Sequence, residues 1–200
     1  MTTSTLRPAL LAGVALFVVF GTGCQSYDEL VTKDQVCEQR WADYQAALQR
    51  RADLVPNLVE TVKAGAKQEQ ATLTAVIEAR AKATSIQLSG EDLEDPAKVA
   101  AFEKAQGELK SALSRLMVVQ EAYPDLKSNQ GFRELQVQLE GTENRILRAR
   151  EQYNAAVAAY NTELKKIRGI AINKVTGKPF KERVYFTASA DAQNAPQVKF

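Results

Sequence analysis

The chain has 200 residues, of which 26 are basic and 24 acidic, so its formal net charge is only +2. This near-neutral balance argues against nucleic acid as a partner, because phosphate binding needs a basic excess on one face. The chain contains no histidine, and so it lacks the commonest general base and the commonest transition-metal ligand. We therefore expect no metal and no cofactor.

The N-terminal segment predicts a membrane tether. An uncharged apolar block at residues 9–20 follows Arg7 and is succeeded by small residues and Cys24. A block of this length resembles the hydrophobic region of a bacterial lipoprotein signal, whereas a membrane-spanning helix needs about 20 residues. We expect residues 1–23 to be a lipoprotein signal peptide and Cys24 to be lipidated.

An uncleaved anchor is the alternative, because no charged residue occurs between Arg7 and Asp28, and these 20 residues at positions 8–27 are just enough to span a membrane. Position 21 is glycine, where lipoprotein signals usually carry leucine, valine or isoleucine. Both alternatives tether the rest of the chain to a membrane on its non-cytoplasmic side.

Apolar residues at alternating steps of three and four predict a first helix at residues 27–64. The pattern keeps its phase through Pro56, so we expect one kinked helix in which the proline removes the hydrogen bond to Ala52. A turn near Gly65 precedes a second helix at 67–88. A single unbroken rod through this region is the alternative.

The third helix has a clear predicted start, with Asp95 as its N-cap and Pro96 at its first position. It ends at Tyr123, which precedes a proline. The fourth helix is predicted at 129–168, with Ser128 as its cap.

These segments predict an all-α fold, namely an antiparallel four-helix bundle with two long helices over residues 24–168. Residues 169–200 break the helical pattern and predict an irregular C-terminal tail. We expect this tail to be an ordered or partly ordered strap that ends in a polar extension at residues 187–200.

The segment around the proline supplies the candidate binding residues, which are Arg50, Arg51, Asp53, Pro56 and Asn57. Arg51 lies on the apolar stripe, so its guanidinium needs an acceptor such as the freed carbonyl or a glutamate of another helix. In the favoured interpretation Arg51 and Asp53 stabilise the bend. In the alternative interpretation, the bend together with Arg50 and Asn57 forms a notch that binds a ligand.

Two further patterns have structural interpretations. Cys37 lies on an apolar stripe and is expected to be an inert, packed thiol. The pairs Tyr153-Asn154 and Tyr160-Asn161 repeat at seven residues, and we expect the tyrosine hydroxyls to reach a wet edge of the core. The mixed charges between residues 140 and 151 are interpreted as a solvated helix face.

No nucleotide-binding glycine loop, nucleophile elbow, zinc-protease motif or calcium-binding loop occurs in the sequence. The absence of these motifs from the sequence therefore favours a protein that is not an enzyme.

The sequence resembles the LemA family over nearly all of the chain that follows the leader. The matching segments are Tyr27-Asp28-Glu29-Leu30, Trp41, the stretch from Arg50 to Val59, Glu78-Ala79-Arg80, Tyr123-Pro124-Asp125-Leu126-Lys127, the stretch from Leu139 to Ile146, the two Tyr-Asn pairs and the ending from Ala195 to Phe200. This resemblance implies an N-terminal membrane anchor and a helical bundle, and it implies no reaction. The cysteine-ended leader resembles a lipoprotein subset, and Gln25 suggests the periplasmic side of the outer membrane.

We therefore expect a membrane-tethered, non-enzymatic adaptor or scaffold whose partners are the membrane, through lipid on Cys24, and another envelope protein. The overhanging helix ends and the basic, aromatic tail are the expected contact regions. An accessory subunit of an envelope enzyme is one alternative. A self-assembling coiled-coil scaffold, and hence a homo-oligomer, is the other.

Overall fold

The computed structural model describes the backbone of residues 6–176 and 180–187, and within it the side chains of residues 27–166, 169–171, 173, 174 and 180–187. Every regular element in this part is a helix, which confirms the all-α class. The expected lipidation of Cys24, the signal peptide and most of the polar extension at 187–200 lie outside the described side chains.

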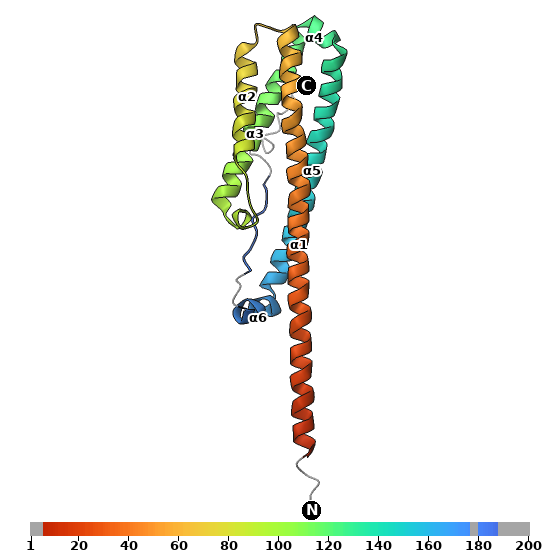
Figure 1. The fold of residues 1–200 in the computed structure, drawn as a ribbon, viewed down its shortest axis with the longest axis vertical. Helices are drawn as coiled ribbons and strands as arrows, with labels where there is room; N and C mark the ends of the chain where they lie inside the picture. The colour runs from red at the N-terminus through yellow and green to blue at the C-terminus, as the bar shows by residue number, and fades with distance from the viewer. Residues whose placement is uncertain (1–5, 177–179, 188–200) are drawn as a thin grey trace, which may run out of the picture.

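The longest element is α1 (Leu6–Gly65), which runs beside the antiparallel helix α5 (Gln130–Lys165) (Figure 1). Its 60 residues correspond to about 90 Å at 1.5 Å per residue. The expected start at residue 27 is wrong, because the helix continues back through the apolar leader, where no proline interrupts residues 9–55. The N-terminal part of α1 thus extends well beyond the other helices (Figure 1).

Helix α1 ends at Gly65, and α2 (Gln70–Ser85) returns along it. The two-helix interpretation of residues 27–88 is therefore correct and the unbroken rod is wrong. After a short 3₁₀ helix, η1 (Glu91–Glu94), the chain enters α3 (Pro96–Val119), which packs against α2. As expected, Asp95 caps α3, and its carboxylate accepts the amide of Ala97 at 2.8 Å.

Pro56 lies inside α1 without ending it. The backbone carbonyl of Ala52, four residues earlier, accepts a hydrogen bond from Nε of Arg80 in α2 at 2.8 Å. The proline cannot supply this bond because it has no N–H. Arg80 therefore satisfies the carbonyl that the proline leaves free, and it joins α2 to α1 at this point.

The connection between α3 and α5 contains η2 (Gln120–Ala122) and the short helix α4 (Pro124–Ser128). Helix α3 therefore ends four residues before the expected Tyr123. The expected cap of the last long helix is also wrong, since Oδ1 of Asn129 accepts the amide of Phe132 at 3.0 Å. The hydroxyl of Ser128 instead donates to the carbonyl of Asp125 and finishes α4.

Helix α6 (Ile167–Thr176) occupies the first part of the segment expected to be an irregular tail. It follows α5 after a break at Lys166, whose backbone is extended. Gly169 is required here, because a Cβ would lie 2.6 Å from the carbonyl oxygens of Glu163 and Leu164. Beyond α6, residues 180–187 form the expected ordered strap.

The apolar core has two parts, one above the other along α1. The lower core surrounds Trp41, which stacks on Phe186 at 5.5 Å and meets Phe102 and Tyr153 edge to face. The upper core surrounds the end of α1 and contains Phe132 of α5. Arg51, only 2% exposed, lies between the two parts.

Among the residues whose side chains the structure describes, no helix is both long enough and apolar enough to cross a membrane.

We predict that Arg80→Met lowers the free energy of unfolding by about 1–3 kcal/mol, because it leaves the Ala52 carbonyl without its donor. Arg145→Met, at an exposed position of α5, is the control and should change stability by about 0.5 kcal/mol or less. Urea unfolding followed by helical circular dichroism measures both. Equal effects of the two substitutions would contradict the role assigned to Arg80.

Candidate functional site

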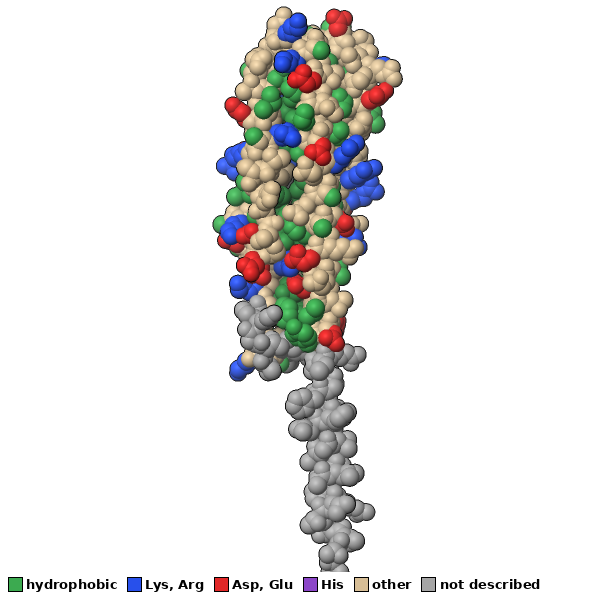
Figure 2. Space-filling model, in the orientation of Figure 1, with side chains coloured by type: hydrophobic (Ala, Val, Ile, Leu, Met, Phe, Trp, Pro, Cys, Tyr) green, Lys and Arg blue, Asp and Glu red, His purple; other side chains and the backbone are tan. Residues whose placement is uncertain are grey.

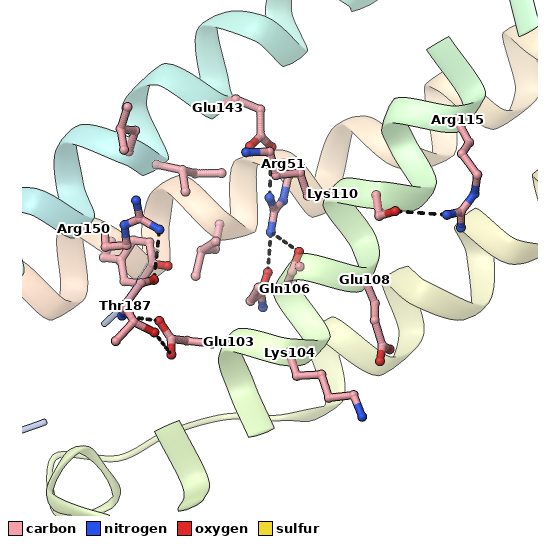
Figure 3. A pocket seen from close by; sticks show the side chains of 16 residues that line it. Arg51, Glu103, Lys104, Gln106, Glu108, Lys110, Arg115, Glu143, Arg150 and Thr187 are labelled. Atoms are coloured by element: carbon pink, nitrogen blue, oxygen red, sulfur yellow. Dashed lines mark hydrogen bonds and ion pairs between the residues drawn. The ribbon is translucent and has the colours of Figure 1, made fainter. Parts of the chain in front are cut away.

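A groove runs between α3 and α5, with α1 beneath it (Figure 3). Its main cavity has a volume of about 570 Å³, and a second cavity of about 370 Å³ lies farther along the same two helices. Tyr44 and Leu48 of α1 and Ile146 of α5 give the main cavity an apolar floor, while its walls carry charges of both signs. Figure 2 shows hydrophobic side chains in a strip along one face of the molecule, with charged side chains on both sides.

Arg51 is the central polar residue of this groove, and its guanidinium joins α1 to both walls. Nη1 donates to the carboxylate of Glu143 in α5 at 2.9 Å, and Nη2 donates to the side-chain oxygen of Gln106 in α3 at 2.6 Å (Figure 3). The amide of Gln106 in turn donates to the carbonyl of Ala83 in α2 at 3.0 Å. Four helices are thus connected through one buried side chain.

The structure brings only one of the five predicted site residues into the groove. Arg51 finds a glutamate of another helix, which was one of its two expected acceptors. Arg50 is exposed and donates to Gln138, and Asp53 is exposed and accepts from Gln49. Pro56 and Asn57 are also exposed, so these five side chains do not converge on a shared notch.

The lower end of the groove is filled by the strap at residues 180–187, which is held by its backbone. Asn161 donates to the carbonyl of Arg183 at 2.9 Å and accepts its amide at 3.0 Å. Asn154 makes the same pair of bonds to Phe186 at 2.7 and 2.9 Å. Each asparagine therefore satisfies both backbone groups of one strap residue.

A third asparagine repeats this arrangement in α6, where Asn173 binds the amide and the carbonyl of Phe180. The clamped strap residues are thus three apart, while Asn154 and Asn161 are seven apart. Seven helical residues rise about 10.5 Å, and three extended residues span about 9–10 Å. The repeat on the helix therefore matches the repeat of an extended chain.

Two strap side chains anchor it further. Phe186 is buried against Trp41 in the lower core. The guanidinium of Arg183 is buried and binds Asp34 at 2.8 Å and Glu38 at 2.5 Å. Burial alone would lower the pKa of Arg183, but its hydrogen bonds to Glu38 and Asp34 raise the pKa above its ordinary value. These contacts show that Arg183 and Phe186 of the tail bind the chain itself, whereas Tyr185 remains 44% exposed.

The strap reaches the lower rim of the main cavity at Thr187 (Figure 3). Its amide donates to Glu103 of α3 at 2.6 Å, and its carbonyl accepts from Arg150 of α5 at 3.3 Å. Burial raises the pKa of Glu103, and the hydrogen bonds from Thr187 oppose that rise. Both walls of the groove therefore hold the end of the strap.

The sequence interpretation missed the asparagine clamps. It also placed the tyrosine hydroxyls at a wet edge, which is wrong, because Tyr153 and Tyr160 are buried and the hydroxyl of Tyr160 donates to the carbonyl of Lys181. The repeat of Tyr-Asn at seven residues was the available signal. Glu143, assigned to a solvated face, is instead the acceptor of Arg51.

Cys37 is buried, as expected for a packed thiol. Burial raises the pKa of its thiol to about 11, so it stays protonated and unreactive near neutral pH. Within the described residues, no group of three or more cysteine, aspartate or glutamate side chains is placed to hold a metal ion.

Comparison with known proteins identifies relatives of most of the chain. Residues 40–200 match the model of the LemA family. The chain is 27% identical to magnetosome protein MamQ 1 and to MamQ 2 of Paramagnetospirillum magneticum, over 88% of this chain and 70% of each relative. It is 26% identical to magnetosome protein MamQ of Magnetospirillum gryphiswaldense, over 86% of this chain and 69% of that protein.

We predict that Asn161→Ala lowers the free energy of unfolding by about 2–4 kcal/mol, because it leaves the amide and the carbonyl of Arg183 unpaired. Asn57→Ala, at an exposed position of α1, is the matched control and should change stability by about 0.5 kcal/mol or less. Urea unfolding measures both variants. A loss no larger at Asn161 than at Asn57 would show that the clamp does not hold the strap.

Proposed function

This chain belongs to the LemA family, and from that premise we propose that it is a membrane-tethered, non-enzymatic adaptor. In this proposal the groove between α3 and α5 binds an extended segment of another envelope protein. The observation that carries the proposal is the strap at residues 180–187, which already lies in the lower part of the groove as an extended chain. Its backbone is recognised by side-chain amides, and such recognition does not depend on the sequence bound.

The open part of the groove has the properties that a second extended segment needs. It continues in line with the strap, it is about 570 Å³ in volume, and its floor is apolar. The side chain of Leu147 on its α5 wall remains 45% exposed. Lys104 and Lys110 on the α3 wall can pair with acidic residues of a partner.

The polar groups at the centre of the groove support an adaptor rather than an enzyme. The guanidinium of Arg51 binds Gln106 and Glu143, and these bonds join the walls to the floor. Changing them during a reaction would loosen the contacts between the helices, because a buried charge that loses its partner is costly. We therefore assign this cluster a structural role in shaping the groove.

The tether in this proposal is lipid on Cys24, at the periplasmic face of the outer membrane, as Gln25 suggests. Once the signal peptide is removed, the part of α1 between Cys24 and Tyr44 holds the groove about 30 Å from the lipid. Such a spacer suits a protein that contacts a partner at a distance from the membrane surface. Stable anchoring by lipid requires more than one acyl chain, which a lipoprotein cysteine can carry.

We predict that the wild-type protein enters the detergent phase on phase separation and that Cys24→Ala moves it to the aqueous phase. The substitution removes the atom that carries the lipid. Cys37→Ser is the control for loss of a thiol and should leave partitioning unchanged, since Cys37 is buried in the bundle. If Cys24→Ala stayed in the detergent phase, residues 8–27 would be acting as an uncleaved anchor.

Binding of a partner in the groove is tested by photo-crosslinking in intact cells. The photoreactive residue benzoyl-phenylalanine replaces Gly107, which lines the main cavity. Gly141 is the matched control: it is also a helical glycine at which a Cβ would meet nothing within 4 Å, but it is exposed and outside the cavity lining. We predict a covalent adduct with a defined envelope protein at Gly107 and a yield at least ten-fold lower at Gly141. The cross-linked site on the partner, read by mass spectrometry, should lie in an extended segment.

The same adducts at both positions would mean that the groove is not the binding surface. Adducts with a helical surface of the partner would contradict the recognition of an extended chain.

A further inference from the structure

We infer that the open part of the groove binds an acidic segment of the partner. The inference rests on the proposed function, and it adds the chemistry of the segment that this groove takes. Within the main cavity, recognition passes from the backbone of the bound chain to its side chains, and glutamate or aspartate side chains fit best. Two features carry this inference, namely the point at which the asparagine clamps end and the charges of the groove that are already paired.

The asparagine clamps on α5 end where the strap reaches the main cavity. They follow a spacing of seven residues, from Asn161 to Asn154, and the next two positions at this spacing are Leu147 and Glu140. Residues seven apart lie on nearly the same face of a helix. Leu147 lines the main cavity, and its side chain has no polar atom with which to bond a peptide group. A segment in the open part therefore lacks the clamp that holds the strap.

No other side-chain amide of the main cavity replaces the missing clamp. Among the described residues that line this cavity, the only amide side chain is that of Gln106. Its oxygen already accepts from Arg51, and its nitrogen already donates to the Ala83 carbonyl. A segment bound here must be recognised mainly through its side chains, so this part of the groove distinguishes one sequence from another.

The carboxylates of the main cavity are already engaged within the chain. Glu143 binds Arg51 at 2.9 Å, and Glu103 accepts two hydrogen bonds from the end of the strap (Figure 3). Glu108 pairs with Lys82 of α2 at 2.7 Å. All three acidic side chains of the lining thus have donors from the protein itself, and they are poorly placed to bind a basic segment.

The basic residues of the same lining are not paired in this way. Within the described part of the chain, Lys104 and Lys110 have no hydrogen-bond or ion-pair partner. Arg115 donates to a serine hydroxyl of its own helix, and Arg150 donates to a backbone carbonyl of the strap. Of the basic residues that line the main cavity, Arg51 alone therefore has a carboxylate partner among the described residues. The remaining positive charge attracts an acidic segment.

The positions of these cations match an extended chain. Arg150 lies on the α5 wall beside the end of the strap. On the α3 wall, Lys110 lies about 10 Å farther along the groove and Arg115 about 18 Å, which correspond to three and about five extended residues. In an extended chain, residues three and five positions on face the side opposite to the first residue. Acidic residues at the first, fourth and sixth positions of a segment thus meet Arg150, Lys110 and Arg115 in turn.

The inference is tested with fluorescent peptides of about nine residues and the detergent-solubilised full chain. The peptides carry glutamate, glutamine or lysine at the first, fourth and sixth positions, with serine and valine elsewhere. We expect the glutamate peptide to bind at least about ten-fold more tightly than the other two, as measured by fluorescence anisotropy. Added salt should reduce this difference, because it screens exposed charges.

A pair of charge-reversed proteins separates the groove from the net charge of the molecule. The double variant Lys104→Glu, Lys110→Glu should weaken binding of the glutamate peptide at least about ten-fold and strengthen binding of the lysine peptide. Both side chains are exposed, so the fold should tolerate the changes. The control is Lys67→Glu, Arg145→Glu, which changes the net charge equally at exposed positions outside both cavities. It should change each affinity less than about two-fold.

Equal binding of the three peptides would overturn the inference and leave the adaptor proposal standing, since the groove would then accept an extended chain of any charge. Equal losses in the two double variants would overturn it too, because the effect would then come from net charge. So would the absence of binding by all three peptides. The adaptor proposal is decided separately, by photo-crosslinking at Gly107 in cells, so the two failures are distinguishable.

Discussion

The arrangement of the molecule depends on one buried guanidinium. Arg51 lies between the two apolar cores, where an unpaired charge would cost several kcal/mol. Its two Nη atoms find acceptors only if α3 presents Gln106 and α5 presents Glu143 at the same height, so the charge fixes the register of these helices against α1. Gln106 extends the constraint to α2 through the Ala83 carbonyl. Apolar contacts alone would allow neighbouring helices to slide, and a polar layer opposes that movement.

The groove follows from the same constraint. Because Arg51 reaches outward from α1 to both walls, its partners line the cavity instead of closing it. Below this level the strap fills the space between α3 and α5 and completes the lower core with Phe186. Above it the described residues leave the space open. One continuous channel thus has an occupied half and an open half, and the proposed function concerns the boundary between them at Thr187.

The features that the sequence predicted correctly are those encoded by neighbours in the chain. Helical periodicity, the break at Gly65 and the Asp95 cap with Pro96 all depend on residues within a few positions of one another. Even so, Ser128 and Asn129 are both good caps, and only the presence of α4 decides between them. The Ala52 carbonyl was correctly expected to lack the proline bond, but its donor, Arg80, is 28 residues away. The asparagine clamps act on partners 22 and 32 residues later, and the need for Gly169 arises only where α6 folds back on α5.

The position of Phe186 also has a consequence for the order in which the protein is made. Trp41 is synthesised early, whereas its stacking partner Phe186 is almost the last residue of the described chain to be made. Until then, the aromatic side chains of the lower core lack one of their walls. The nascent chain therefore keeps part of this aromatic surface exposed until synthesis is nearly complete, and only release of the finished chain allows the lower core to close.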